Sequence, residues 1–310
     1  MSVSVIALVM VKLFLILILG YILEKTGILD DHANRKISTL IANVTSPLLV
    51  LASVLTASKD GRSSVFVILA AGFLMYVGFI LIGKIVVKVF RVNAIDKPAV
   101  ECMMMFANVS FMGYPVLQSV LGDEAIFYCT MMHFAFNILV YTYGVNCFKQ
   151  NKDGEKSSLK DALQKCVNPG FIINMLALLV YVTGFRMNGI VYDTVYMVGN
   201  ITSPLSMIIL GSTMALFPLK ESLCQKKSYI FAVIRLLVIP TIICGICRLT
   251  GVNEYFTGIA TISTGMPVAA MVLILANQYE SPSRKLVVSN ILITTALSVV
   301  TIPLLVAFLL

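Results

Sequence analysis

Long apolar stretches recur along almost the whole chain and are separated by short polar connectors. A helix needs roughly 20 apolar residues to cross the hydrocarbon core of a bilayer. Ten stretches approach or exceed that length: 4–23, 36–56, 64–88, 98–120, 124–148, 168–185, 190–217, 228–249, 255–278 and 286–309. The pattern predicts an all-α membrane protein with ten transmembrane helices.

The composition supports lipid as the solvent. Of the 310 residues, 59% are hydrophobic and 12% are charged, whereas soluble domains have about 45–50% apolar and about 25% charged residues. The first stretch has no A-x-A cleavage site and runs directly into Glu24 and Lys25. We therefore interpret it as a retained span and not as a signal peptide.

The net charge of +8 could suggest a nucleic-acid partner, but the positions of the basic residues argue against one. Of the 23 Lys and Arg residues, 17 lie in connectors after odd-numbered stretches and 4 after even-numbered ones. Positive charge favours the cytoplasmic side of a membrane. This asymmetry predicts a protein of the plasma (inner) membrane with both termini extracellular or periplasmic, and it makes membrane lipid the expected partner of the surface.

The chain contains an internal repeat. Residues 43–48 read NVTSPL and residues 200–205 read NITSPL, while G-Y-P-V at 113–116 returns as G-M-P-V at 265–268. The repeat predicts a first five-helix unit (1–148), a cytoplasmic linker (149–167) and a second five-helix unit (168–310). Because five is odd, the second unit enters the membrane from the opposite side, which gives an inverted repeat typical of secondary transporters.

Each NxTSPL motif places a proline inside a predicted span. Proline has no backbone N–H and leaves the carbonyl four residues earlier without its donor; these carbonyls belong to Asn43 and Asn200. Two interpretations stay open. The motif is a kink satisfied by its own hydroxyl groups, or it is a hinge or part of the wall of a polar site.

The fourth and ninth spans contain FANVSFMGYPV (106–116) and ATISTGMPVAA (260–270). Gly-x-Pro favours a break followed by a new helix with proline in its first turn. The predicted orientation brings both new helix N-termini to the bilayer centre, where their N–H groups attract an anion. The candidate substrate-binding residues are Asn108, Ser110, Gly113, Tyr114, Pro115, Ser263, Thr264, Gly265, Met266 and Pro267, with Asn43, Asn200 and Arg235 as more distant candidates. The alternative is a pair of packing kinks without a ligand.

Three ionisable residues in the spans also have two interpretations. Arg235 either extends toward the cytoplasmic headgroups or helps to hold or admit an anion. Glu101 is either a solvated carboxylate at the cytoplasmic mouth or a ligand of a coupling ion. His133 either makes hydrogen bonds between helices or takes part in proton coupling.

These motifs resemble those of the auxin efflux carrier family. The resemblance rests on the two NxTSPL motifs, N-V-S-F-M-G-Y-P (108–115) and G-M-P-V (265–268), and it covers the whole chain. It implies a scaffold part and a moving part in each half, elevator-type alternating access, and a homodimer formed through the scaffold. It also implies broken helices that cross at Pro115 and Pro267, with Asn108 near the substrate.

The resemblance implies an organic anion as substrate, either auxin or a small dicarboxylate. Ser110 stands where glycine is expected, and the long hydrophilic loop of many plant carriers is missing, so a small carboxylate is favoured. The sequence shows no metal-ligand cluster or nucleophile–base pair; we therefore expect no enzyme activity, no metal site and no cofactor, with Na⁺ or H⁺ coupling left open. The alternatives are a sodium-coupled carrier similar to the bile acid symporters and an anion channel.

Overall fold

The computed structural model describes residues 3–55, 64–149, 167 and 169–309. Over these residues the chain is helical, and the only extended pairing is an isolated antiparallel bridge between Ala107 and Val268. The predicted all-α class is confirmed. Helix is present in each of the ten predicted apolar stretches, while the predicted linker lies almost entirely outside the described residues.

The elements fall into two series, with π-helical turns labelled η. The first series is α1 (Val3–Lys25), α2 (Asp31–Leu40), η1 (Ile41–Thr45), α3 (Ser46–Leu55), α4 (Ser64–Val89), α5 (Lys97–Met105), η3 (Val109–Gly113), α6 (Tyr114–Leu121), α7 (Glu124–Met132), α8 (Phe134–Leu139), η4 (Val140–Gly144) and α9 (Val145–Lys149). The second is α11 (Pro169–Thr183), α12 (Ile190–Asn200), α13 (Thr202–Ala215), α14 (Leu219–Leu223), α15 (Lys226–Val233), η5 (Ile234–Val238), α16 (Ile239–Leu249), α17 (Glu254–Thr264), α18 (Ala270–Gln278) and α19 (Arg284–Leu309).

Six continuous helical segments among the described residues are long and apolar enough to cross a bilayer, and α7 with α8 and α9 forms a seventh if its 40° bend is counted within one span. The helices of the fourth and ninth stretches are short because each stretch is broken near its middle. The six or seven spans show a multi-pass membrane protein. The exact number of ten stays a prediction.

Three of the prolines are preceded by a π-helical turn. Pro47, Pro115 and Pro240 are each the second residue of an α-helix that follows η1, η3 or η5 directly. A wider turn uses hydrogen bonds to the fifth preceding residue, as from Ser46 N–H to the Ile41 carbonyl. The turn therefore accommodates the missing proline donor, and the helix continues through the proline.

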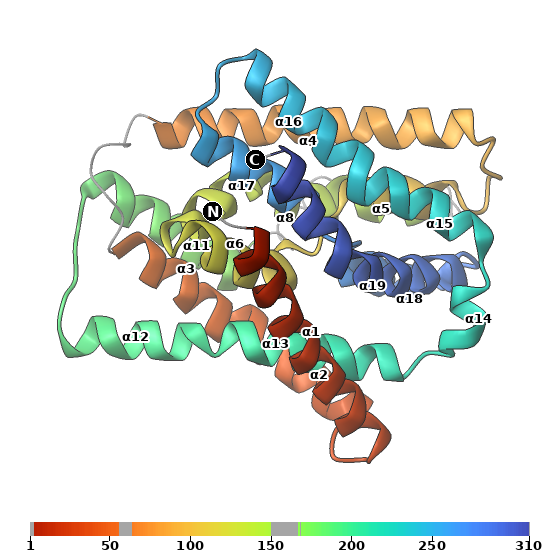
Figure 1. Cartoon of the computed structure of the whole chain (residues 1–310), viewed down its shortest axis with the longest axis horizontal. Helices are drawn as coiled ribbons and strands as arrows, with labels where there is room; N and C mark the ends of the chain where they lie inside the picture. The colour runs from red at the N-terminus through yellow and green to blue at the C-terminus, as the bar shows by residue number, and fades with distance from the viewer. Residues whose placement is uncertain (1–2, 56–63, 150–166, 168, 310) are drawn as a thin grey trace.

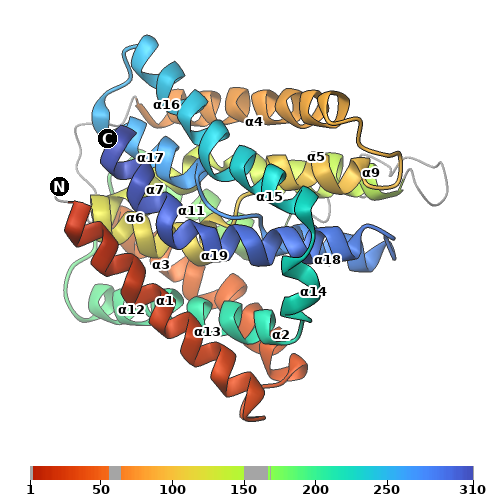
Figure 2. The ribbon, with the colours of Figure 1, turned by 45° about the vertical axis from the view of Figure 1, so that its right-hand side comes forward.

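The helices α1, α2–α3, α11 and α12–α13 pack against one another, and Figures 1 and 2 show α12–α13 lying next to both α1 and α2–α3. The closest approach is between α1 and α13. A Cβ atom on Gly20 would lie 2.0 Å from the Ile208 carbonyl oxygen, and one on Gly211 would lie 1.8 Å from that of Leu17. Glycine lets these two backbones come together, as small residues do in membrane helix pairs.

Candidate functional site

The two broken spans meet through their backbones. The first break is the extended segment Phe106–Asn108 between α5 and η3, and the second is Gly265–Ala269 between α17 and α18. Asn108 donates its N–H to the Pro267 carbonyl at 2.8 Å, and Ala269 donates to the Phe106 carbonyl at 3.0 Å. We call this pair of segments the crossing.

The second break is also held by a helix outside the crossing. The Val268 N–H donates to the hydroxyl oxygen of Thr294 in α19 at 3.2 Å, and Thr294 donates to its own helix at the Asn290 carbonyl. This bond satisfies a backbone donor that the broken helix cannot satisfy itself, as buried segments require.

The position predicted for the first break was wrong. Gly113 has helical dihedral angles (φ −67°, ψ −45°), and Pro115 lies in the continuous helix formed by η3 and α6. The reason is the π-helical turn of η3, which absorbs the missing donor of Pro115 without a break. The crossing therefore lies at Ala107 and Val268 and not at Pro115 and Pro267, although Pro267 does belong to the second break.

The two Gly-x-Pro motifs nevertheless touch. A Cβ atom on Gly113 would lie 3.4 Å from the Cγ of Met266, and one on Gly265 would lie 2.6 Å from a methyl carbon of Leu305. These glycines allow close packing behind the crossing. Gly113 and Met266 were expected to lie together at a ligand site. They do lie together, and the contact between them is a packing contact.

Asn108 is the residue directly before η3 and is 7% exposed. Its side chain makes no hydrogen bond to the start of that helix, and no other partner of its amide is found in the described part of the chain. The first N–H groups of a helix have no partner within it, and the first of these in η3, that of Val109, donates to the Ala107 carbonyl at 2.9 Å. The Asn108 amide and the remaining N–H groups of the first turn of η3 form a group of donors beside the crossing.

The antiparallel bridge fixes which helix ends are neighbours. Asn108, at the start of η3, pairs with Pro267, which follows the end of α17; Ala269, at the start of α18, pairs with Phe106, which follows the end of α5. Each positive N-terminus therefore lies beside the negative C-terminus of the other span. The helix dipoles largely balance each other here, so they do not alone make an anion site.

Arg235 changes that balance. Its side chain is 0% exposed, its Nη1 donates to the Met104 carbonyl at 3.1 Å, and its Cζ lies 6.0 Å from the centre of the Phe79 ring. Met104 belongs to the last turn of α5, where carbonyls lack helical donors. The interpretation that Arg235 extends to the headgroups is wrong, because the guanidinium is enclosed by protein next to the crossing.

The charge of Arg235 has no protein counter-ion in the part of the chain that the structure describes, since Arg235 takes part in no ion pair there. Its Nε and Nη2 groups also have no hydrogen-bond partner among these residues. A buried, unpaired guanidinium with two available donors is therefore the strongest positive feature near the crossing.

His133, between α7 and α8, links α4 to the last turn of α17, two residues before the second break. The Tyr76 hydroxyl lies 2.9 Å from His133 Nδ1, and His133 Nε2 lies 2.9 Å from the Ser263 hydroxyl. The interpretation of His133 as a link between helices is confirmed. Sequence reasoning did not connect it with the site, since the spacing of His133 and Ser263 gives no sign of their contact.

Ser263 and Thr264 were expected to donate hydrogen bonds to a ligand. Both are fully buried, and both hydroxyls donate to the Ala260 carbonyl, at 3.2 Å and 2.7 Å respectively. The Thr264 proton is used within α17, and the Ser263 hydroxyl is shared between the Ala260 carbonyl and His133 Nε2. In the other span, Ser110 is exposed on η3, while the Tyr114 hydroxyl is buried and lies 2.8 Å from Thr130 Oγ1.

The remaining candidates lie elsewhere. Asn43 is exposed on η1, and the Asn200 side-chain oxygen accepts from Gln118 Nε2 at 2.9 Å, so Asn200 joins α12 to α6. Glu101 is 7% exposed and accepts from the Tyr143 hydroxyl at 2.7 Å, so its assignment as a solvated carboxylate was wrong. Within the described residues no three His, Cys, Asp or Glu side chains form a metal-binding group.

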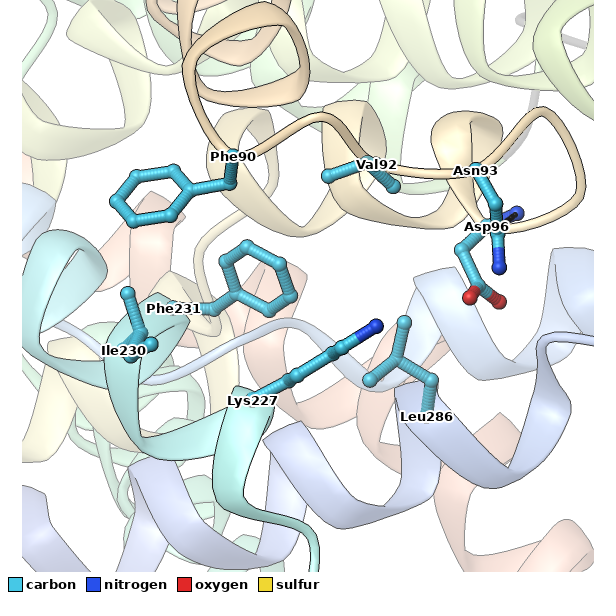
Figure 3. A pocket seen from close by; sticks show the side chains of 8 residues that line it. All are labelled: Phe90, Val92, Asn93, Asp96, Lys227, Ile230, Phe231 and Leu286. Atoms are coloured by element: carbon cyan, nitrogen blue, oxygen red, sulfur yellow. Dashed lines mark hydrogen bonds between the residues drawn. The ribbon is translucent and has the colours of Figure 1, made fainter.

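A cavity of about 180 Å³ opens between the connector of α4 and α5 and the starts of α15 and α19 (Figure 3). Figure 3 shows the Lys227 ammonium and the Asp96 carboxylate on its wall, together with the rings of Phe90 and Phe231. One charge of each sign gives it no preference for an anion. None of the candidate residues lines it.

These features define the class: a multi-pass helical membrane protein with two broken helices paired at a buried crossing, an arrangement typical of secondary transporters. Residues 5–306 match the family model described as membrane transport protein. The chain therefore belongs to this family, the auxin efflux carrier family of transporters, which are not enzymes.

Two archaeal proteins named as uncharacterized transporters are similar over almost their whole length. The one from Methanocaldococcus jannaschii is 26% identical over 311 residues, covering 96% of each chain. The one from Methanothermobacter thermautotrophicus is 26% identical over 306 residues, covering 94% of this chain and 95% of its own. Both comparisons support transport as the function of the chain.

Proposed function

We propose that the protein is a secondary carrier that moves a small organic anion with a carboxylate group across the plasma membrane by elevator-type alternating access. The proposal includes ten spans in two inverted five-helix repeats, both termini outside, and a homodimer. The observation that supports the anion is Arg235, which is enclosed beside the crossing without a counter-ion among the described residues.

The electrostatic argument starts from the helix ends. The two N-termini and two C-termini at the crossing contribute partial charges of opposite sign, about half an elementary charge each. Arg235 caps the C-terminal carbonyl of Met104 and adds a full positive charge. The crossing then has a net positive potential, which favours a bound anion.

The free-energy cost of burying the Arg235 charge also favours a bound anion. A buried charge without a partner costs several kcal/mol, and a bound anion offsets that cost by pairing with it. Arg235 Nε and Nη2 supply two donors in the geometry that suits a carboxylate. Asn108 supplies an uncharged amide that can orient the ligand, and the first turn of η3 supplies backbone donors.

The test is a comparison of binding and transport with purified protein. A series of mono- and dicarboxylates should raise the melting temperature in a saturable way, because a ligand that binds only the folded state stabilises it. In proteoliposomes a ligand found in this way should be taken up by counterflow. Current without saturation or counterflow would support the channel alternative, uptake that requires sodium would support the symporter-like alternative, and cations as the only ligands would refute the anion proposal.

A further inference from the structure

The two copies of the repeated motif pack against each other, which the sequence repeat did not reveal. A Cβ atom on Gly199 would lie 2.8 Å from the backbone of Leu49, and Ser212 Oγ lies 2.9 Å from Asn34 Oδ1. From the first contact to the second, the chain runs back from Leu49 to Asn34 in one segment and forward from Gly199 to Ser212 in the other. The segments α2–α3 and α12–α13 therefore run antiparallel, and they lie side by side in Figures 1 and 2.

Thr45 and Thr202 lie at the same level of this helix pair. Thr45 is four residues before Leu49 and Thr202 is three residues after Gly199, so each is about one turn from that contact, on the same side of it. They are also equivalent positions, the third residue of each motif. A twofold axis that relates the two halves would pass between them.

The hydroxyl groups at this level have no partner. Thr45 is 3% exposed and Thr202 is 0% exposed, and the hydroxyls of both, together with that of Ser203, make no hydrogen bond to the described residues. Hydroxyls inside helices normally donate to a carbonyl three or four residues earlier, as Thr264 does here. A buried polar group without a partner is unfavourable. Other buried threonine hydroxyls of the described residues also lack a partner, but Thr45 and Thr202 occupy equivalent positions of the two motifs at one level, which indicates a ligand between the helices.

The polar groups around Thr45 and Thr202 indicate which kind of ligand binds there. Pro47 and Pro204 have no backbone N–H, so the turn before each proline has one helical donor fewer than it has carbonyl oxygens. Oxygen atoms of hydroxyls and carbonyls are therefore the available ligands. Divalent cations usually require carboxylates, and no metal-binding group of acidic or histidine side chains occurs in the described chain. Backbone carbonyls freed at helix irregularities bind sodium in transporters.

We infer that a sodium ion binds between Thr45 and Thr202, held by hydroxyl and backbone carbonyl oxygens. The ion joins the two halves of the chain at the level where their equivalent motifs face each other. This site is separate from the crossing and involves neither Arg235 nor Asn108, so the inference stands or falls independently of the proposed anion site.

The experiment measures thermal unfolding of purified full-length protein while sodium chloride replaces choline chloride at constant ionic strength. The parent should show a midpoint that rises with sodium and saturates, by about 2 °C or more. The double variant Thr45→Val/Thr202→Val, which keeps the side-chain shape, should lose this shift. Thr45→Ser should retain it, because the hydroxyl remains.

Thr194→Val is the matched control. Thr194 lies on α12, and its exposed hydroxyl already donates to the Ile190 carbonyl at 2.7 Å, so this variant should keep the full sodium shift. A parent without a sodium shift, or a double variant that retains it, would overturn the inference. A double variant that melts lower by the same amount in both salts would indicate bound water instead, and one that melts higher in both would indicate hydroxyls without any ligand.

Discussion

Asn108 donates its backbone N–H to the carbonyl of Pro267 at 2.8 Å, and this bond joins two residues that are 159 positions apart in the sequence. It fixes where the two broken spans meet. It also uses the backbone of Asn108 and leaves its side chain available, since that side chain makes no bond to the start of η3. The structural and ligand-binding roles of Asn108 are therefore separable by substitution.

Asn108→Ala should weaken carboxylate binding and leave the crossing intact. The backbone bond to Pro267 does not need the side chain, whereas loss of one hydrogen bond to a charged ligand costs about 1.5–3 kcal/mol, roughly tenfold to a hundredfold in affinity. Titration of the purified variant, with its melting temperature measured in parallel, checks this. An unchanged dissociation constant would remove Asn108 from the site.

Thr294→Val should destabilise the second break. The Val268 N–H loses its acceptor, and a buried donor left without a partner costs about 1–3 kcal/mol. Thr295→Val is the matched control, because the neighbouring Thr295 hydroxyl is buried and has no partner among the described residues; this variant should be neutral or slightly stabilising. If thermal unfolding shows equal effects for the two variants, the bond to Thr294 does not hold the break.

The sequence predicted the fold better than it predicted the position of the first break. Apolar stretches of bilayer length and the repeated motifs were enough for an all-α membrane protein with broken fourth and ninth segments. The residues Gly113 and Pro115 suggested a break that the structure places at Phe106–Asn108. A π-helical turn can accommodate a proline, and no residue pattern before Pro115 distinguishes that outcome from a break.

The sequence also did not predict which residues of distant segments contact each other. The contacts of Arg235 with Met104 and of His133 with Ser263 join segments 131 and 130 residues apart. Hydrophobic periodicity indicates that a residue is within a span, but it does not indicate which helix lies opposite. Asn108 and Arg235 lie at or beside the crossing, and the anion site there stays a prediction. The free hydroxyls expected at Ser263 and Thr264 are instead bonded to the Ala260 carbonyl of α17.

The orientation in the membrane can be tested with two exposed asparagines in described connectors. Asn93 lies between α4 and α5, which is cytoplasmic in the proposed topology, and Asn188 lies between α11 and α12, which is outside. In a variant without the seven native cysteines, an impermeant thiol reagent added to intact cells should label Asn188→Cys and spare Asn93→Cys. The reverse pattern would invert the topology, and equal labelling after lysis serves as the accessibility control.

Arg235→Gln should separate the charge of this residue from its hydrogen bond. Glutamine can still donate to the Met104 carbonyl, which Arg235 Nη1 contacts at 3.1 Å, but it removes a buried positive charge that has no counter-ion in the described chain. Without carboxylate the variant should unfold at an equal or higher temperature than the parent, because an unpaired buried charge is costly. With carboxylate it should lose most of the ligand-induced rise, with an affinity about tenfold to a hundredfold lower.

Arg235→Lys completes the test, because it keeps the charge and loses the two-pronged geometry that suits a carboxylate. Its affinity should fall between those of the parent and Arg235→Gln. If all three proteins bind carboxylates equally well, Arg235 serves only to cap α5, and the positive potential at the crossing does not hold the substrate. If Arg235→Gln alone fails to bind while its unfolding remains cooperative, the charge itself is what the anion requires.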